Sequence, residues 1–408
     1  MSVTISRQCP ASRRFASLLF MILLLTAGYA DEAIKVPLQT RRAWDYDRPE
    51  VHFDCHFSGA RLNGCEQLGT NEFRVLITPE NEPINNSPWY AFKVRAAQRQ
   101  TITLDLVNTY ALQRGRPWLS VDGKNWHVAD REQYANRVSA HPPVLRLAIG
   151  PEPVWVAAWD IVSLPQINDW MEALASRAGV EIHSAGNSIE GRPLRYFILG
   201  AATNAGLVFV IGRQHPPEIT GTIGLERFVE TLAGDTPLAR EYRRHFQTVV
   251  VPVVNPDGVE HGHWRSNLGG VDLNRDWQDF SQPETRAVRD LFLKLAAATG
   301  GGPQLFLDFH STGTNIFYAQ PEAPGDRLPG FADRWLAGLR AQLPAFGFER
   351  DDRHNATLAT GKDWVHGQWH IPSLTCEFGY QTDRLLIQHA GEMEAVGVMK
   401  LLLARFGQ

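Results

Sequence analysis

The chain has 408 residues, of which 44% are hydrophobic and 21% are charged. This is an ordinary composition for a globular protein that buries a sizeable core. The formal net charge of −4 argues against nucleic acid or anionic lipid as a partner held by bulk electrostatics. The length leaves room for two domains beyond a targeting segment.

Residues 1–30 have the layout of a signal peptide. Two arginines at 13 and 14 precede an apolar run over 15–26, and Gly28 and Ala30 place small residues just before a cleavage site. The run is short for a membrane span, although an uncleaved N-terminal anchor is an alternative. We expect the mature chain to be exported to a periplasmic or extracellular space, without stable membrane association.

Three cysteines follow this segment. Cys55 and Cys65 are close enough in sequence to close a short loop by a disulfide, which export would permit. Two free thiols are equally compatible, because a sequence gives no distance between sulfur atoms. Cys376 lies in an apolar run and is most simply a buried small residue.

Residues 31–163 are predicted to form an antiparallel β-sandwich domain. Short segments with alternating hydrophobicity are separated by turn residues such as those over 121–125, and this pattern is typical of a sandwich. The clearest strands are expected at 73–78, 89–94, 101–107 and 153–157.

Residues 164–408 are predicted to form an α/β domain, in which a mixed and mostly parallel sheet is flanked by helices. Leu207–Gly212 is a nearly continuous apolar run of the kind found in strands buried on both faces. Further strands are expected at 180–183, 194–199, 248–254, 304–309 and 373–378, and helices at 166–177, 219–232, 284–298, 331–342 and 384–406.

Three side chains at strand ends have the ligand types of a catalytic zinc ion. His215 and Glu218 follow the apolar strand that ends at Gly212, with two prolines that suit a helix start. His310 follows the apolar strand 304–309 and precedes a segment that reads as a loop. Ligand sites gather at the carboxyl ends of parallel strands. Two nitrogens and one carboxylate match zinc sites that keep a position open for water.

Other polar residues suit the chemistry around such an ion. Glu377 lies in an apolar strand, where a carboxylate is costly unless it is paired or functional, so it is a candidate general base; a structural salt bridge is the alternative. Asp272 is a candidate partner for the second ring nitrogen of a zinc-bound histidine. Arg275, with Asn274 beside it, can hold a carboxylate, and Arg265 can stabilise an oxyanion.

Together these motifs resemble the zinc metallocarboxypeptidases of the carboxypeptidase A/B clan. The resemblance implies one zinc ion per chain, held by His215, Glu218 and His310, and a peptide or protein C-terminus as the partner. It further implies that Arg265 is the oxyanion residue, that Asn274 and Arg275 bind the terminal carboxylate, and that Glu377 is the general base. The motifs, in chain order, are His215-Pro-Pro-Glu218, Asn255-Pro-Asp-Gly258, Trp264-Arg265, Gly270-Val-Asp-Leu-Asn-Arg275, His310-Ser311 and Glu377.

Segments outside the metal site are similar to the cytosolic carboxypeptidase subfamily. They lie at 86–92, 113–118 and 120–126. Ala359-Thr-Gly-Lys362 resembles a subfamily motif that usually reads Thr-Gly-Arg and lines the pocket for the last substrate residue. Lys362 keeps the positive charge, which implies a preference for terminal Glu or Asp; a solvated loop lysine is the alternative. The tyrosine that the family places near this pocket has no assignment, since Tyr318 and Tyr380 are expected elsewhere.

The sequence therefore predicts an exported zinc carboxypeptidase with acidic preference. One alternative is an amidase or carboxypeptidase that acts next to diaminopimelate in cell-wall peptides, where a basic pocket is equally suitable. The other alternative is an inactive peptide-binding module, which the complete set of catalytic residue types disfavours.

Overall fold

The computed structural model describes residues 1, 34–111, 114–135, 142–200, 206–355 and 358–404. Residues Ala33–Gln408 belong to one compact unit, so the predicted domain boundary at 163/164 stays a prediction. The predicted signal peptide lies outside the described residues apart from Met1, and it too stays a prediction. Among the helices that the structure describes, none is both long and apolar enough to cross a membrane.

The chain first forms two β-sheets that share one core, which confirms the predicted all-β sandwich. Phe53 of one sheet packs on Phe73 of the other, with ring centroids 5.3 Å apart. The expectation of purely antiparallel pairing is wrong for β4 and β6, which run parallel because the chain crosses to the other sheet through β5 between them. One sheet has the order β1 (Ala43–Asp47), β2 (Glu50–Asp54), β5 (Ala91–Ala96), β11 (Val154–Ala157), β7 (Trp118–Ser120), β8 (His127–Val128), and the other β3 (Gly64–Gly69), β4 (Glu72–Ile77), β6 (Gln100–Asn108), β10 (Val144–Ile149), β9 (Tyr134–Ala135).

The cysteines of this region are not bonded. Cys55 and Cys65 are both free thiols, and the buried Cys55 donates a hydrogen bond to the carbonyl oxygen of Arg42 at 3.2 Å. Burial raises the pKa of Cys65 to about 12, so this thiol is not a reactive nucleophile. Cys376 is buried, as predicted.

An eight-stranded mixed sheet follows, and four of its seven strand pairs are parallel, which confirms the predicted α/β fold. Its central strands are nearly or fully buried along their length. Strand order in this sheet is β12 (Ile182–Asn187), β13 (Pro193–Leu199), β15 (Phe246–Val251), β14 (Gly206–Gly212), β16 (Pro303–Thr312), β19 (Ser373–Gly379), β17 (Ile316–Tyr318), β18 (Glu349–Asp351).

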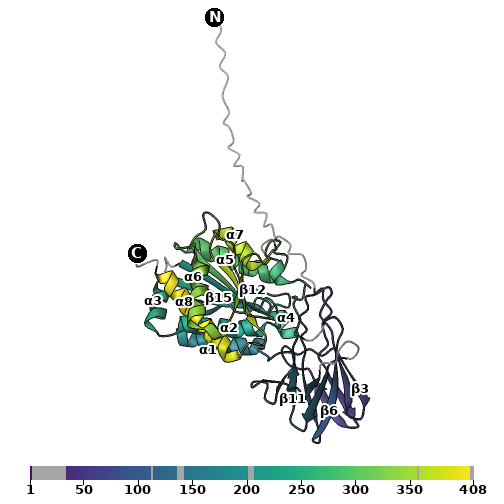
Figure 1. The fold of residues 1–408 in the computed structure, drawn as a ribbon. Helices are drawn as coiled ribbons and strands as arrows, with labels where there is room; N and C mark the ends of the chain where they lie inside the picture. Colours follow the sequence, from purple (N-terminus) through teal and green to yellow (C-terminus); the bar gives the residue numbers. More distant parts are fainter. Residues whose placement is uncertain (2–33, 112–113, 136–141, 201–205, 356–357, 405–408) are drawn as a thin grey trace. The chain divides into compact units, whose positions relative to one another are not determined.

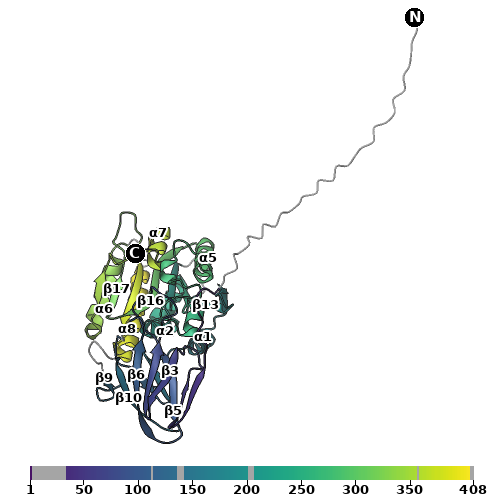
Figure 2. The ribbon, with the colours of Figure 1, turned by 90° about the vertical axis from the view of Figure 1, so that its right-hand side faces the viewer.

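Helices cover both faces of this sheet (Figure 1, Figure 2). Along β14, Val208 and Val210 pack into one core, and Phe209 and Ile211 pack into the other. This alternation follows from the period of two along a strand. The first core includes α1 (Leu164–Ala178), α2 (Ile219–Ala233), α3 (Pro237–His245), α6 (Phe331–Gln342) and α8 (Arg384–Leu403), and the second includes α5 (Pro283–Ala298) and α7 (Gly361–Trp369).

Two local predictions near the metal ligands are wrong in detail. Strand β16 continues through Thr312, so Ser311 and Thr312 extend the strand and do not begin the predicted loop, because β19 keeps pairing with β16 as far as Gly379. Helix α2 begins at Ile219 with Glu218 as its N-cap. The two prolines therefore lie in the turn before the helix, and Glu218 stands where strand and helix meet.

Glycine at 221 lets α2 approach the strand that carries His310. A Cβ atom at this position would lie 2.5 Å from the carbonyl oxygen of His310 and 2.8 Å from its backbone nitrogen. The Gly221 N–H also donates to the Ser311 hydroxyl at 2.9 Å. Any side chain at 221 would therefore move Glu218 and His310 apart.

Substitution Gly221→Ala should destabilise the protein by about 1–3 kcal/mol through overpacking and should weaken zinc binding. The matched control is Gly338→Ala on α6, where an added Cβ meets only the end of Gln342 at 3.8 Å and should stabilise the helix by about 0.5–1 kcal/mol. Denaturant unfolding of both variants measures the difference. Equal stability of the two variants would contradict the close-approach explanation.

Candidate metal centre

Glu218 lies between two imidazole rings at the carboxyl ends of the parallel strands β14 and β16. Its Oε1 is 2.8 Å from Nδ1 of His215, and its Oε2 is 2.7 Å from Nδ1 of His310. All three residues are buried, and one ligand atom from each lies within 4.8 Å of the others. The Ser311 N–H also donates to Oε2 at 3.2 Å. The predicted ligands thus converge on one point.

The second nitrogen of each ring faces an outer carboxylate. His215 Nε2 is 2.8 Å from Asp272 Oδ1, and His310 Nε2 is 2.9 Å from Asp308 Oδ2. Asp272 is therefore where the sequence placed it. Asp308 was missed, although it occupies the same face of β16 two residues before His310, where a buried carboxylate is costly without a function. Gln214 donates to this carboxylate at 2.7 Å.

This arrangement fits a divalent cation. The Asp272 carboxylate holds the proton on Nε2 of His215 and leaves the Nδ1 lone pair of this ring toward Glu218. A lone pair and a carboxylate oxygen at 2.8 Å repel each other unless a positive charge joins them. Burial lowers the pKa of His310, but the charges of Asp308 and Glu218 outweigh burial and raise that pKa well above its usual value. A positive charge at the centre of this cluster is therefore stabilising. Two imidazoles and one carboxylate are a ligand set typical of zinc.

Glu377 faces this cluster from the neighbouring strand. It is the register partner of His310 across the β16–β19 pair. Its Oε2 is buried and has no hydrogen-bond partner in the part of the chain that the structure describes. Burial, together with the charge of Glu218, raises the pKa of Glu377 to about 7. A carboxyl group with this pKa can both accept and return a proton near neutral pH.

The predicted arginines lie beside the cluster. Arg265 Nε donates to Asp272 Oδ2 at 2.6 Å, so one carboxylate joins this guanidinium to His215. Arg275 is half-buried, and its Nη1 donates to the carbonyl oxygen of Asn274 at 2.7 Å. The Asn274 Oδ1 accepts from the Gly361 N–H at 3.0 Å. The Asn274 amide therefore also links its loop to the first residue of α7.

Glu80, three residues after the end of β4, holds the loop that carries Arg265. Its carboxylate accepts three backbone N–H groups, from Trp264 at 2.7 Å, Arg265 at 2.9 Å and Ser266 at 2.7 Å. Glu80 is 1% exposed. A single buried carboxylate thus fixes three consecutive peptides. This role was not predictable from sequence patterns, because 184–186 positions separate the partners.

Lys362 is not a solvated loop lysine. Its side chain is 2% exposed, and its Nζ lies 3.0 Å from Asp363 Oδ1. The pKa of His354 is lowered, first by burial and further by the charges of Lys362 and Arg275. Lys362 and Arg275 are therefore both close enough to His354 to lower its pKa.

The expectation that Tyr318 lies away from this region is wrong. The Tyr318 ring stacks on His354 with centroids 4.1 Å apart. Burial, followed by the charge of Glu377, raises the pKa of Tyr318 to about 12. Tyr380 stacks on Trp159 and also feels the charge of Glu377. No sequence spacing indicated the contact with His354, because it depends on the pairing of β17 with β18, where Tyr318 is the register partner of Asp351.

Fold and site together define a class of protein: a metal-dependent hydrolase built on a mixed α/β sheet. Residues 167–327 match the family model described as zinc carboxypeptidase. An uncharacterized protein of Zymomonas mobilis is 24% identical over 81% of this chain and 88% of its own length. Cytosolic carboxypeptidase 6 of Caenorhabditis elegans is 24% identical over 71% of this chain and 70% of its own length.

A solved structure supports the fold. The metallo-carboxypeptidase of Burkholderia cenocepacia superposes with a TM-score of 0.73 at 18% identity, covering 87% of this chain and 99% of that chain. The match identifies a zinc carboxypeptidase domain over residues 167–327. This domain is a peptide hydrolase, and its cofactor is zinc.

Proposed function

We propose that this zinc carboxypeptidase removes the last residue of peptides and prefers a terminal Glu or Asp. The observation that carries the preference is the buried Lys362 ammonium, whose side chain is 2% exposed and whose Nζ lies 3.0 Å from Asp363 Oδ1. An acidic side chain that reaches this ammonium gains a charge-assisted hydrogen bond. Asp363 already shares Lys362, so the substrate carboxylate competes with that pair.

Each group near the metal has a proposed task. Zinc, held by His215, Glu218 and His310, supplies a Lewis acid and lowers the pKa of water. Arg275 binds the terminal carboxylate, because a guanidinium matches the geometry of a carboxylate.

The remaining groups handle protons and developing charge. Asn274 supplies an amide donor beside Arg275. Arg265 stabilises the negative charge that develops on the scissile carbonyl oxygen. Glu377 accepts a proton from the attacking water and returns it to the departing amine. Its raised pKa of about 7 suits both steps.

The activity is tested with Glu377→Gln and a peptide that is offered with a free or an amidated C-terminus. We expect the native protein to release one residue from the free form only, and the variant to lose about 10²–10⁴-fold in kcat while it retains zinc. Glu181→Gln, at an exposed position before β12, is the matched control. Unchanged kcat in Glu377→Gln, with zinc bound, would remove Glu377 from the mechanism.

The preference is tested with peptides that end in Glu, Asp, Leu, Phe, Lys or diaminopimelate. Substitution Lys362→Met keeps the buried stem and removes the charge. It should reduce kcat/KM for the Glu peptide by about 10–100-fold relative to the Leu peptide, as expected for a charged hydrogen bond. Preference for Leu or Phe that Lys362→Met leaves unaltered would refute the acidic pocket. Cleavage restricted to diaminopimelate peptides would favour the cell-wall reaction.

A further inference from the structure

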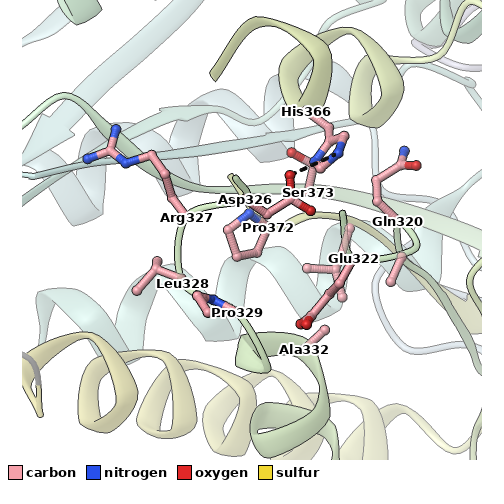
Figure 3. Close-up of a pocket in the computed structure, with 12 residues that line it drawn as sticks. Gln320, Glu322, Asp326, Arg327, Leu328, Pro329, Ala332, His366, Pro372 and Ser373 are labelled. Carbon is pink, nitrogen blue, oxygen red and sulfur yellow. Dashed lines mark ion pairs between the residues drawn. The ribbon is translucent and has the colours of Figure 1, made fainter. Parts of the chain in front are cut away.

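A second group of metal-ligating side chains lies at the amino end of β19. Asp326, from the segment between β17 and α6, and His366, on α7, line a pocket that Figure 3 shows. His370 caps the carboxyl end of α7, and one ligand atom from each of these residues lies within 4.8 Å of the others. Ser373 lines the same pocket and precedes Glu377 by four residues, or roughly 13 Å of strand. The group is therefore separate from the catalytic centre.

The Asp326 carboxylate is buried, and only one of its two oxygens accepts a hydrogen bond. Its side chain is 7% exposed, and Oδ2 accepts the Ala323 N–H at 2.6 Å. Oδ1 is buried with no hydrogen-bond partner within the described ranges. It lies 3.7 Å from Nε2 of His366 and 3.7 Å from Nδ1 of His370. These distances are too long for hydrogen bonds, so the three atoms face a common point without satisfying one another.

The protonation of His366 suits a ligand. Its Nδ1 faces the Ile371 carbonyl oxygen at 3.1 Å, and a carbonyl accepts only from a protonated nitrogen. The Nε2 atom then presents its lone pair toward Asp326, where Figure 3 draws the two groups facing each other. A backbone carbonyl that fixes the tautomer in this way is typical of metal-bound histidine.

The spacing of the atoms matches a transition-metal ion. Two ligands bonded to zinc at about 2.0–2.1 Å in a tetrahedron lie about 3.4 Å apart, a few tenths of an ångström less than the 3.7 Å observed. His370 follows the last residue of α7, and its N–H donates to the carbonyl oxygen of His366 at 2.7 Å, which keeps the two residues together. His370 adopts a left-handed φ of 52°, which is unfavourable for a residue with a Cβ atom. Its side chain is 64% exposed, which leaves room for water as a further ligand.

We propose that Asp326, His366 and His370 form a second divalent-metal site, with Zn²⁺ as the ion favoured by two imidazoles and one carboxylate. The ion would join the carboxyl end of α7 to the segment before α6. Gly361, at the other end of α7, donates to Asn274 of the catalytic centre. The second ion would therefore hold in place the helix that carries Lys362. The site does not depend on the peptide specificity proposed above.

Zinc content per chain tests this site without reference to activity. The native protein, His370→Asn and His389→Asn are dialysed against zinc buffered at micromolar concentration and measured by elemental analysis. Asparagine tolerates the left-handed backbone at 370, and His389 is an exposed histidine on α8 outside both groups. We expect two ions per chain in the native protein and in His389→Asn, and one in His370→Asn.

A second variant, Asp326→Asn, tests whether loss of the ion in His370→Asn comes from a local change in backbone structure. Asp326→Asn is isosteric and removes the charge, and it should also leave one ion per chain, with circular dichroism unchanged. One ion in the native protein would overturn the proposal. Two ions retained in both His370→Asn and Asp326→Asn would overturn it equally, because the second ion would then lie elsewhere.

Discussion

The structure depends on one carboxylate that two imidazoles share. Glu218 brings a full negative charge to a place closed off by α2 and two strands, and His215 and His310 face it with Nδ1 at 2.8 and 2.7 Å. Buried charge is costly unless it is compensated, so this cluster is stable only with positive charge at its centre. The close approach of α2 at Gly221 places Glu218 beside His310. The two outer carboxylates, Asp272 and Asp308, orient the histidine rings. Metal binding and local folding are therefore coupled.

The same charge separates the roles of two glutamates. Burial would raise the pKa of Glu218, but His215 and His310 lower it well below its usual range. Burial also acts on Glu377, and there the charge of Glu218 adds to it and raises the pKa to about 7. One carboxyl group thus remains ionised, as a metal ligand must, and the other can exchange a proton. Environments that separate the pKa values of two carboxyl groups indicate their division of labour.

The hydrophobic periodicity of the sequence predicted the helices and strands, and the polar residues at strand ends predicted the site. The sheet, its main helices and the ligands at 215, 218 and 310 follow from apolar runs and from polar residues placed after them. Contacts that tertiary packing creates were not predictable. Glu80 reaches the Arg265 loop from the β-sandwich, 185 positions earlier in the chain, and Tyr318 meets His354 only after β17 pairs with β18. Helix α7 was missed because nine residues give a weak period, although Thr360 accepts from the Asp363 N–H as its N-cap.

Anomalous scattering at the zinc edge, from crystals of the zinc-loaded protein, tests the central claim most directly. We expect a peak at about 2.0–2.2 Å from Nδ1 of His215, Nδ1 of His310 and the carboxylate of Glu218, with Nε2 of each ring still on Asp272 and Asp308. A peak bonded to Nε2 of either ring, or no peak within bonding distance of all three residues, would contradict the charge argument on which the site is built.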